Sequence, residues 1–297
     1  MSSSVLNLLN ENLLKFFDVQ LVRRSWLNGA LAPSDSAFPP ETWAMIELPG
    51  SLKLWIDLGD KYVSLGCLAG AYERDETTFI LNTVKQGQTF VDIGANIGWF
   101  AVQAAKNVGP GGKVIAIEPR AVTGKYLAQS LQANGFTDCA EVHHCAVGAE
   151  AGRFNIAWDG KAGNPGGTWS LPDEKMAQDF RDIGHCVESV EVRTLDSIVA
   201  NRKVDVIKID IEGAEGLALR GATQTLAQSR PVIMSEMNFS LLPKISGVSA
   251  GDFVRWMAQQ GYHCHALDAG KAGPALHADN LPGHLLFINV IFQPASK

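Results

Sequence analysis

Short apolar runs alternate with helical patterns along most of the chain. Runs of Val, Ile and Phe predict strands over Thr89–Ile93, Val114–Ile117, Cys139–Val147, Val204–Ile209, Val232–Ser235, Tyr262–Ala266 and Leu285–Phe292. Apolar positions three and four residues apart predict helices over Trp99–Lys106, Val122–Ala133, Ala214–Gln228 and Ala250–Gln260. This alternation predicts an α/β fold, with a doubly wound, seven-stranded, Rossmann-like sheet covered on both faces. No helical pattern separates the last two strands, so we expect the last strand to be antiparallel.

The pattern before residue 89 is different. Met1–Arg24 carries an apolar stripe at helical spacing, Met45–Leu48 and Lys53–Leu58 read as a short hairpin, and Thr77–Lys85 reads as a helix. We therefore divide the chain into an N-terminal accessory segment, residues 1–88, and a main domain, residues 89–297. Inside that domain, Trp158–Ser170 is rich in glycine and is expected to form an ordered loop or lid.

Composition narrows the class of protein. Hydrophobic residues make up 46% of the 297 residues, which excludes a largely disordered chain. The net charge of −6 argues against a nucleic-acid partner, and Asp210–Gly213 stands where base N-methyltransferases carry an N/D-P-P-Y/F motif. No stretch reaches the roughly 18 apolar residues of a membrane span. Five cysteines without a C-x-x-C pair favour a reducing, cytoplasmic location; a homo-oligomer stays open.

The segment Val91–Trp99 joins the strand at Thr89–Ile93 to the following helix through a glycine turn. Gly94 and Gly98 lack a Cβ atom, so the backbone can turn tightly and leave room for a ligand. A dinucleotide site needs further glycines at position 96 and near position 99, where this chain has Asn96 and Trp99. A nicotinamide-dependent oxidoreductase is therefore disfavoured but kept as an alternative.

The pattern D-x-G-x-x-x-G over Asp92–Gly98 suits S-adenosylmethionine, which has no phosphate. Its amino acid end carries an ammonium group, so an acid such as Asp92 near the turn is attractive. Glu118 follows the next strand along the chain, and an acid there can accept hydrogen bonds from both ribose hydroxyls. The turn and Glu118 together predict an S-adenosylmethionine site.

Several motifs, in this order, resemble the FkbM-type family of S-adenosylmethionine-dependent methyltransferases. They are Val91–Gly98, Glu118–Pro119, Ala146–Gly148, Thr194–Asp196, Ile207–Glu215, Gly221–Ala222 and Pro231–Glu236. The likeness covers about residues 89–236, and Tyr72-Glu73 also looks like a family feature. The resemblance implies an O-methyltransferase that acts on a hydroxyl of a sugar, glycan or natural-product small molecule.

The resemblance also implies which residues form the site. The expected cofactor-binding residues are Glu73, Asp92, Gly94, Asn96, Gly98, Glu118, Pro119, Cys145, Ala146 and Asp210. The expected substrate residues are Asn164, Trp169 and Glu212. Asn164 and Trp169 belong to a segment that resembles the family's acceptor region, and an aromatic surface suits the face of a sugar or an apolar acceptor.

Asp210 and Glu236 follow neighbouring predicted strands, so we expect their carboxylates to converge. They could take the proton of the acceptor hydroxyl, orient that hydroxyl, or ligate a cation such as Mg²⁺. His144 is a further candidate for the base. We expect base catalysis with no metal ligands, while a divalent metal stays an alternative. A non-catalytic S-adenosylmethionine-binding protein is the remaining alternative.

Overall fold

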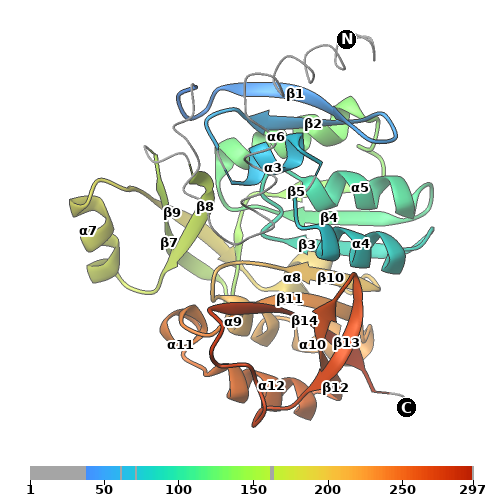
Figure 1. Ribbon diagram of the computed structural model, residues 1–297, viewed down its shortest axis with the longest axis vertical. Coiled ribbons are helices and arrows are strands. Elements are labelled where there is room, and N and C mark those ends of the chain that lie inside the picture. Colours follow the sequence, from blue (N-terminus) through green and yellow to red (C-terminus); the bar gives the residue numbers. More distant parts are fainter. Residues whose placement is uncertain (1–37, 61, 71, 161–163, 296–297) are drawn as a thin grey trace.

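A central sheet of eight strands organises the chain (Figure 1). The computed structural model describes residues 38–60, 62–70, 72–160 and 164–295, so the helix predicted over Met1–Arg24 lies outside the described residues. Across the sheet the strands are β13 (Lys271–Leu276), β12 (Tyr262–Asp268), β14 (Phe287–Pro294), β11 (Val232–Asn238), β10 (Val206–Ile209), β3 (Thr89–Ile93), β4 (Lys113–Ile117) and β5 (Ala140–His143).

The strand pairing confirms the doubly wound arrangement and corrects the strand count. Strands β5, β4, β3, β10 and β11 are parallel, and β14 runs antiparallel to both β11 and β12. The antiparallel last strand is therefore confirmed. The predicted number of strands, seven, is one too few, because β13 pairs antiparallel with β12 at the edge of the sheet. No β-branched residue occurs in Lys271–Leu276, so no apolar run marked this strand.

Helices cover both faces of the sheet, and each face has its own core. One core includes residues of α5 (Trp99–Val108) and α6 (Ala121–Ala133). The other includes residues of α8 (Leu195–Val199), α9 (Glu215–Arg220), α10 (Thr223–Gln228), α11 (Leu241–Ile245) and α12 (Ala250–Gln259). Strand β10 shows the expected alternation, because Ile207 and Ile209 lie in the second core while Lys208 lies over the Phe100 ring on the opposite face.

A second sheet stands beside the main one (Figure 1, left) and was not predicted. Its order is β6 (Ala146–Val147), β9 (Cys186–Arg193), β7 (Gly152–Asp159) and β8 (Asn164–Leu171), and α7 (Glu174–Asp182) packs on it. The prediction of a loop or lid over Trp158–Ser170 was therefore wrong. The described residues 158–159 and 164–170 of this segment belong to the antiparallel hairpin of β7 and β8.

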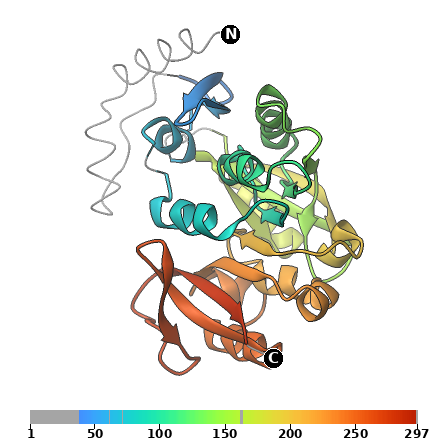
Figure 2. The same cartoon turned by 90° about the vertical axis from the view of Figure 1, so that its right-hand side faces the viewer.

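The described residues before Thr89, namely 38–60, 62–70 and 72–88, share a core with the main sheet rather than packing apart from it. The hairpin of β1 (Trp43–Leu48) and β2 (Leu52–Asp57) contributes to the first core, followed by α3 (Val63–Leu68) and α4 (Arg74–Thr83). Figure 2 shows α4 between this hairpin and the C-terminal strands, and α4 contacts α5, β12 and β13. None of the helices in the described ranges combines the length and apolar composition that crossing a bilayer requires.

Two predicted elements are divided in the structure. The strand predicted over Cys139–Val147 ends at His143, and Ala146–Val147 pairs instead with β9 of the second sheet. The helix predicted over Ala214–Gln228 becomes α9 and α10. The break is at Gly221, where a Cβ atom would lie 2.1 Å from the carbonyl oxygen of Gly148. The chain can pass this close to Gly148 only with a glycine.

Candidate functional site

A cavity of about 1530 Å³ lies at the carboxyl ends of β3, β4, β10 and β11. Crevices at this edge of a parallel sheet are where open α/β proteins bind ligands. Most of the predicted site residues line the cavity, namely Glu73, Gly94, Asn96, Glu118, Pro119, Cys145, Ala146, Asp210, Glu212 and Glu236. The fold therefore brings together residues that are far apart in the sequence.

The two glycines of the turn are needed mainly for packing. A Cβ atom on Gly94 would lie 2.1 Å from the carbonyl oxygen of Asp210, and one on Gly98 would lie 2.3 Å from Leu127 of α6. Both glycines have left-handed backbone angles. Only Gly94 lines the cavity, whereas Gly98 and Asp92 lie behind its wall. Burial raises the pKa of Asp92 to about 6, and Lys208, its neighbour across the strand pair, opposes that rise.

Glu118 is held in place by the backbone. Its Oε2 atom accepts a hydrogen bond from the amide of Asn96 at 3.0 Å, and its Oε1 atom accepts one from the amide of Arg120 at 2.9 Å. The side chain is 5% exposed, and burial raises its pKa to about 7. Each carboxylate oxygen has a second lone pair, so a ligand hydroxyl can still be bound there.

Asp210 forms an ion pair with a buried lysine. The Nζ atom of Lys208 lies 3.1 Å from Oδ2 of Asp210 and 4.8 Å from the centre of the Phe100 ring. Nearby Asp210, Glu73 and Asp92 outweigh burial and raise the pKa of Lys208. Lys208 is therefore a fixed positive charge at the base of the cavity.

Three further acids crowd around this ion pair. Burial raises the pKa of Glu212 to about 7, and the charge of Asp210 adds to the rise. Burial also raises the pKa of Glu73 and of Glu236; Lys208 opposes the rise for Glu73, while neighbouring acids increase it for Glu236. Glu236 stands beside Asn289 of β14 in register, and Asn289 donates a hydrogen bond to Glu76 of α4. Several carboxyl groups thus gather around one cation, Lys208, in this part of the cavity.

Three non-glycine residues of the cavity wall have left-handed backbone conformations. They are Glu73, Asn96 and Glu212, with φ angles of 40°, 50° and 53°. Such conformations cost of the order of 1 kcal/mol or more for a residue with a side chain. Since strained residues cluster at functional sites, this strain agrees with a ligand-binding role for the wall.

A model of the methyltransferase FkbM domain family matches residues 92–264, more than half of the chain. This chain belongs to the FkbM methyltransferase family. The matched region contains Glu118, Asp210 and Glu236 but not the part of the cavity wall that α4 and β14 supply.

Relatives of this FkbM-family chain cover different shares of its length. Methyltransferase sdnD from Sordaria araneosa is 25% identical over 158 residues, 45% of this chain and 60% of sdnD. The structure of methyltransferase FkbM from Methylobacillus flagellatus KT has 17% identity and a TM-score of 0.41, covering 78% of this chain and 55% of that protein. M. jannaschii TYW2, solved in complex with AdoMet, has 15% identity and a TM-score of 0.45, covering 86% of each chain.

Some predicted residues of the FkbM-family chain do not reach the cavity. Trp169 pairs with Ala157 across the β7–β8 hairpin and packs with Phe180 of α7, because the pleat turns this face of the second sheet away from the cavity. His144 is exposed beyond the end of β5 and packs near Gly124 of α6. Asn164 lies in β8, but its side chain is outside the described residues.

Glu215 has a structural role in this FkbM-family chain. It is fully buried, and its Oε1 atom accepts hydrogen bonds from the amides of Ile211 at 3.0 Å and Gly213 at 3.2 Å. These bonds hold the turn that carries Glu212. The carboxylate therefore stabilises the loop after β10 through two backbone donors of that loop.

Sequence reasoning missed part of the cavity wall. The residues that were not predicted as site residues include Tyr62, Tyr72, Glu76, Phe287, Asn289 and Lys208, although Tyr72 and Lys208 belong to the motifs that resemble the family. The indole Nε1 of Trp99 donates to Thr77 at 2.7 Å, and this bond holds α4 beside the glycine turn. The polar, half-exposed face of α4 gave no sign of that contact.

Among the described residues, no three His, Cys, Asp or Glu side chains are arranged to hold a metal ion.

Proposed function

We propose that this FkbM-family chain transfers the methyl group of S-adenosylmethionine to a hydroxyl of a sugar, glycan or natural-product small molecule. The observation that supports the proposal is that one cavity is lined both by Glu118 with the glycine turn and by the acids around Lys208. We assign Glu118, the glycine turn and Glu73 to a cofactor end, Glu212 and Glu236 to an acceptor end, and Asp210, beside Lys208, to both. Residues from 62–70 and 72–78 line the same cavity, so we propose that the accessory segment, residues 1–88, helps to select the acceptor.

The residues at the cofactor end fit S-adenosylmethionine. Glu118 has lone pairs for the two ribose hydroxyls, and Asn96, Pro119, Cys145 and Ala146 line the same end. The carboxyl groups around Lys208 adjoin this end, because Gly94 of the turn lies against the backbone of Asp210. Their surplus suits a ligand that carries a positive sulfonium, and it disfavours the pyrophosphate of a dinucleotide. When bound, S-adenosylmethionine supplies an electrophilic methyl group next to that sulfonium.

At the acceptor end, we assign the proton transfer to Asp210. Lys208 pairs with its Oδ2 atom, and within the described residues its Oδ1 atom makes no hydrogen bond. That oxygen is the atom we propose to accept the proton of the acceptor hydroxyl as the new O–C bond would form and the sulfur–methyl bond would break, with S-adenosylhomocysteine as the leaving group. Glu236 and Glu212, whose pKa values burial raises, can donate hydrogen bonds when protonated and so orient the acceptor. His144 has no part in this proposal because it lies outside the cavity lining.

Two measurements test the proposal. Calorimetry should show binding of S-adenosylhomocysteine and no binding of NAD; the opposite result would defeat the cofactor assignment. A mass-spectrometric screen against hydroxylated sugars and natural products should then detect an acceptor that gains one methyl group. Cofactor binding without turnover of any acceptor would favour the non-catalytic alternative. Activity that chelators abolish and Mg²⁺ restores would assign a metal role to Asp210 and its neighbours.

A further inference from the structure

Arg120 is an unusually buried cation at the junction of three segments. Its side chain is about 4% exposed, and burying a guanidinium is unfavourable unless other groups compensate for the lost water. It donates to Glu41, just before β1, at 2.8 Å, and to Thr123 of α6 at 3.4 Å. Its guanidinium also lies 4.6 Å from the centre of the Trp158 ring, on β7 of the second sheet. One side chain thus joins the N-terminal segment, the loop after β4 and the second sheet.

Arg120 also holds Glu118 in place, through its backbone rather than its side chain. The backbone amide of Arg120 donates to Oε1 of Glu118 at 2.9 Å. A shift of the Arg120 backbone toward or away from Trp158 would therefore move the carboxylate of Glu118 as well. Neither Arg120 nor Trp158 lines the cavity, so neither is a contact residue for the ligand.

Trp158 lies on the face of the second sheet that is turned toward the cavity. Side chains alternate along a strand, so Trp158 shares its face with Ile156 and Phe154, and both of these line the cavity. The residues opposite them on β8, Thr168 and Ser170, line it as well. Holding Trp158 therefore holds this wall of the cavity at a fixed position relative to Glu118.

We propose that Arg120 is a positioning residue for the cofactor end. Through Trp158 and its own backbone amide, it sets the spacing between the second sheet and Glu118 and thereby the affinity for S-adenosylmethionine-type ligands. The inference rests on the proposed function, because it needs Glu118 to bind that ligand. A guanidinium over an indole face is worth enough for its loss to change an affinity severalfold to tenfold.

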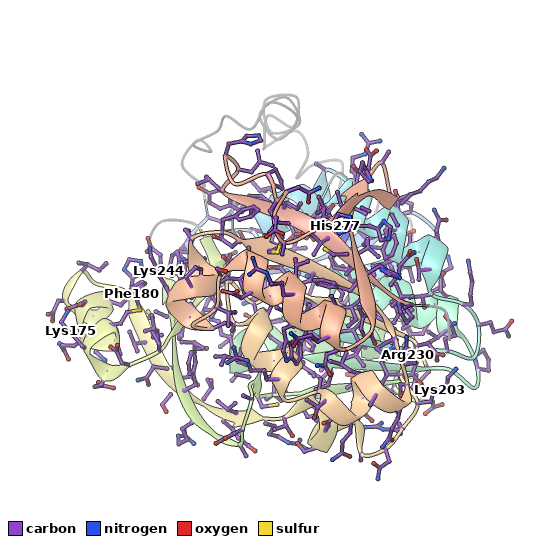
Figure 3. All side chains as sticks on the ribbon, turned by 90° about the horizontal axis from the view of Figure 1, so that it is seen from below. Lys175, Phe180, Lys203, Arg230, Lys244 and His277 are labelled. Carbon is purple, nitrogen blue, oxygen red and sulfur yellow. The ribbon has the colours of Figure 1, made fainter. Side chains whose placement is uncertain are left out.

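The test is a double-mutant cycle with S-adenosylhomocysteine as the ligand, measured by calorimetry. Arg120→Met and Trp158→Leu should each weaken binding roughly tenfold, and the double variant should also be weakened roughly tenfold, because one contact is lost in all three. Trp158→Phe, which keeps an aromatic face, should restore most of the affinity. Arg230→Met is the matched control, because it removes a guanidinium that lies over another aromatic ring, 5.9 Å from the centre of the Tyr262 ring. Figure 3 shows Arg230 on the side of the molecule opposite Phe180 of α7, the helix that packs on the second sheet.

The outcomes separate this inference from the function on which it rests. Wild-type protein that does not bind S-adenosylhomocysteine would defeat both. Normal binding by folded Arg120→Met, independent losses that multiply in the double variant, or Trp158→Phe as weak as Trp158→Leu would defeat the positioning role alone. If Arg120→Met fails to fold, the two Trp158 variants decide, because this half-buried ring tolerates replacement better than a buried charge does. A general loss of stability, as expected in Arg230→Met, should leave the affinity unchanged.

Discussion

The two ends of the cavity use the same residue type in opposite ways. At the cofactor end, the carboxylate of Glu118 is held by two backbone amides at 3.0 and 2.9 Å. At the proposed acceptor end, Asp210, Glu212 and Glu236 gather near Lys208, and burial and neighbouring acids raise the pKa of Glu212 and of Glu236. A carboxyl group fixed by amides is suited to binding, whereas a crowded set with unequal proton affinities is suited to proton transfer.

The largest expected effect lies at the acceptor end. Asp210→Asn should slow methyl transfer by roughly 10²–10⁴-fold, the usual scale for loss of a general base, while S-adenosylhomocysteine binds nearly as before. Steady-state kinetics and calorimetry on the same preparation measure both quantities. Asp179→Asn, on the exposed surface of α7, is the control for the chemical change. Near-normal turnover in a well-folded Asp210→Asn protein would transfer the role to Glu236.

The cofactor end should respond in affinity rather than rate. Glu118→Ala should weaken binding of S-adenosylhomocysteine by about 1.5–3 kcal/mol, the scale of hydrogen bonds to a charged group, with turnover retained at saturating S-adenosylmethionine. Glu212→Ala, at the other end, should leave that affinity almost unchanged. Equal losses of affinity in the two variants would mean that the cavity has no such division.

Stability of the ligand-free protein should fall as the pH rises through neutrality. Burial raises the pKa of Glu118 and of Glu212 to about 7, above the 4.5 of an exposed glutamate, so the folded state binds more protons than the unfolded state between these values. The stabilisation is complete below pH 4.5 and is lost as the pH passes 7. For Glu118 the loss between pH 5.5 and 8 is about 2 kcal/mol.

Denaturant unfolding at the two pH values measures this loss. Glu118→Gln and Glu212→Gln should each remove a similar part of the pH dependence, because burial raises the pKa of both acids to about 7. A stability that rises over this range in the wild-type protein would contradict the assignment of raised pKa values to these acids.

The smallest expected effect on function is at Trp169. Because its ring packs against Phe180 and His185 on the outer face of the second sheet, Trp169→Leu should lower the melting temperature but change ligand affinity less than about twofold. Trp158→Leu, on the inner face of the same hairpin, is the matched contrast. A large loss of affinity in Trp169→Leu would mean that both faces of the hairpin act on the cavity.

The sequence predicted the main sheet well because its parallel strands are buried on both faces and therefore appear as apolar runs. The second sheet was missed because its antiparallel strands are half-exposed; the alternation Val190-Glu191-Val192-Arg193 in β9 was the available signal. Glu118, Asp210 and Glu236 were predictable as acids that follow apolar strands. Glu76 and Asn289 were not, because only the tertiary fold brings α4 and β14 together.

The left-handed backbone at Glu73, Asn96 and Glu212 has a consequence for anyone who evolves this protein in the laboratory. Glycine adopts such angles without steric cost, so a selection for heat resistance alone would favour glycine at these three positions. Each replacement would also delete a side chain from the cavity wall. Variants enriched by thermal selection should therefore include well-folded proteins that have lost their ligand, and a library meant to retain activity should keep these three codons fixed.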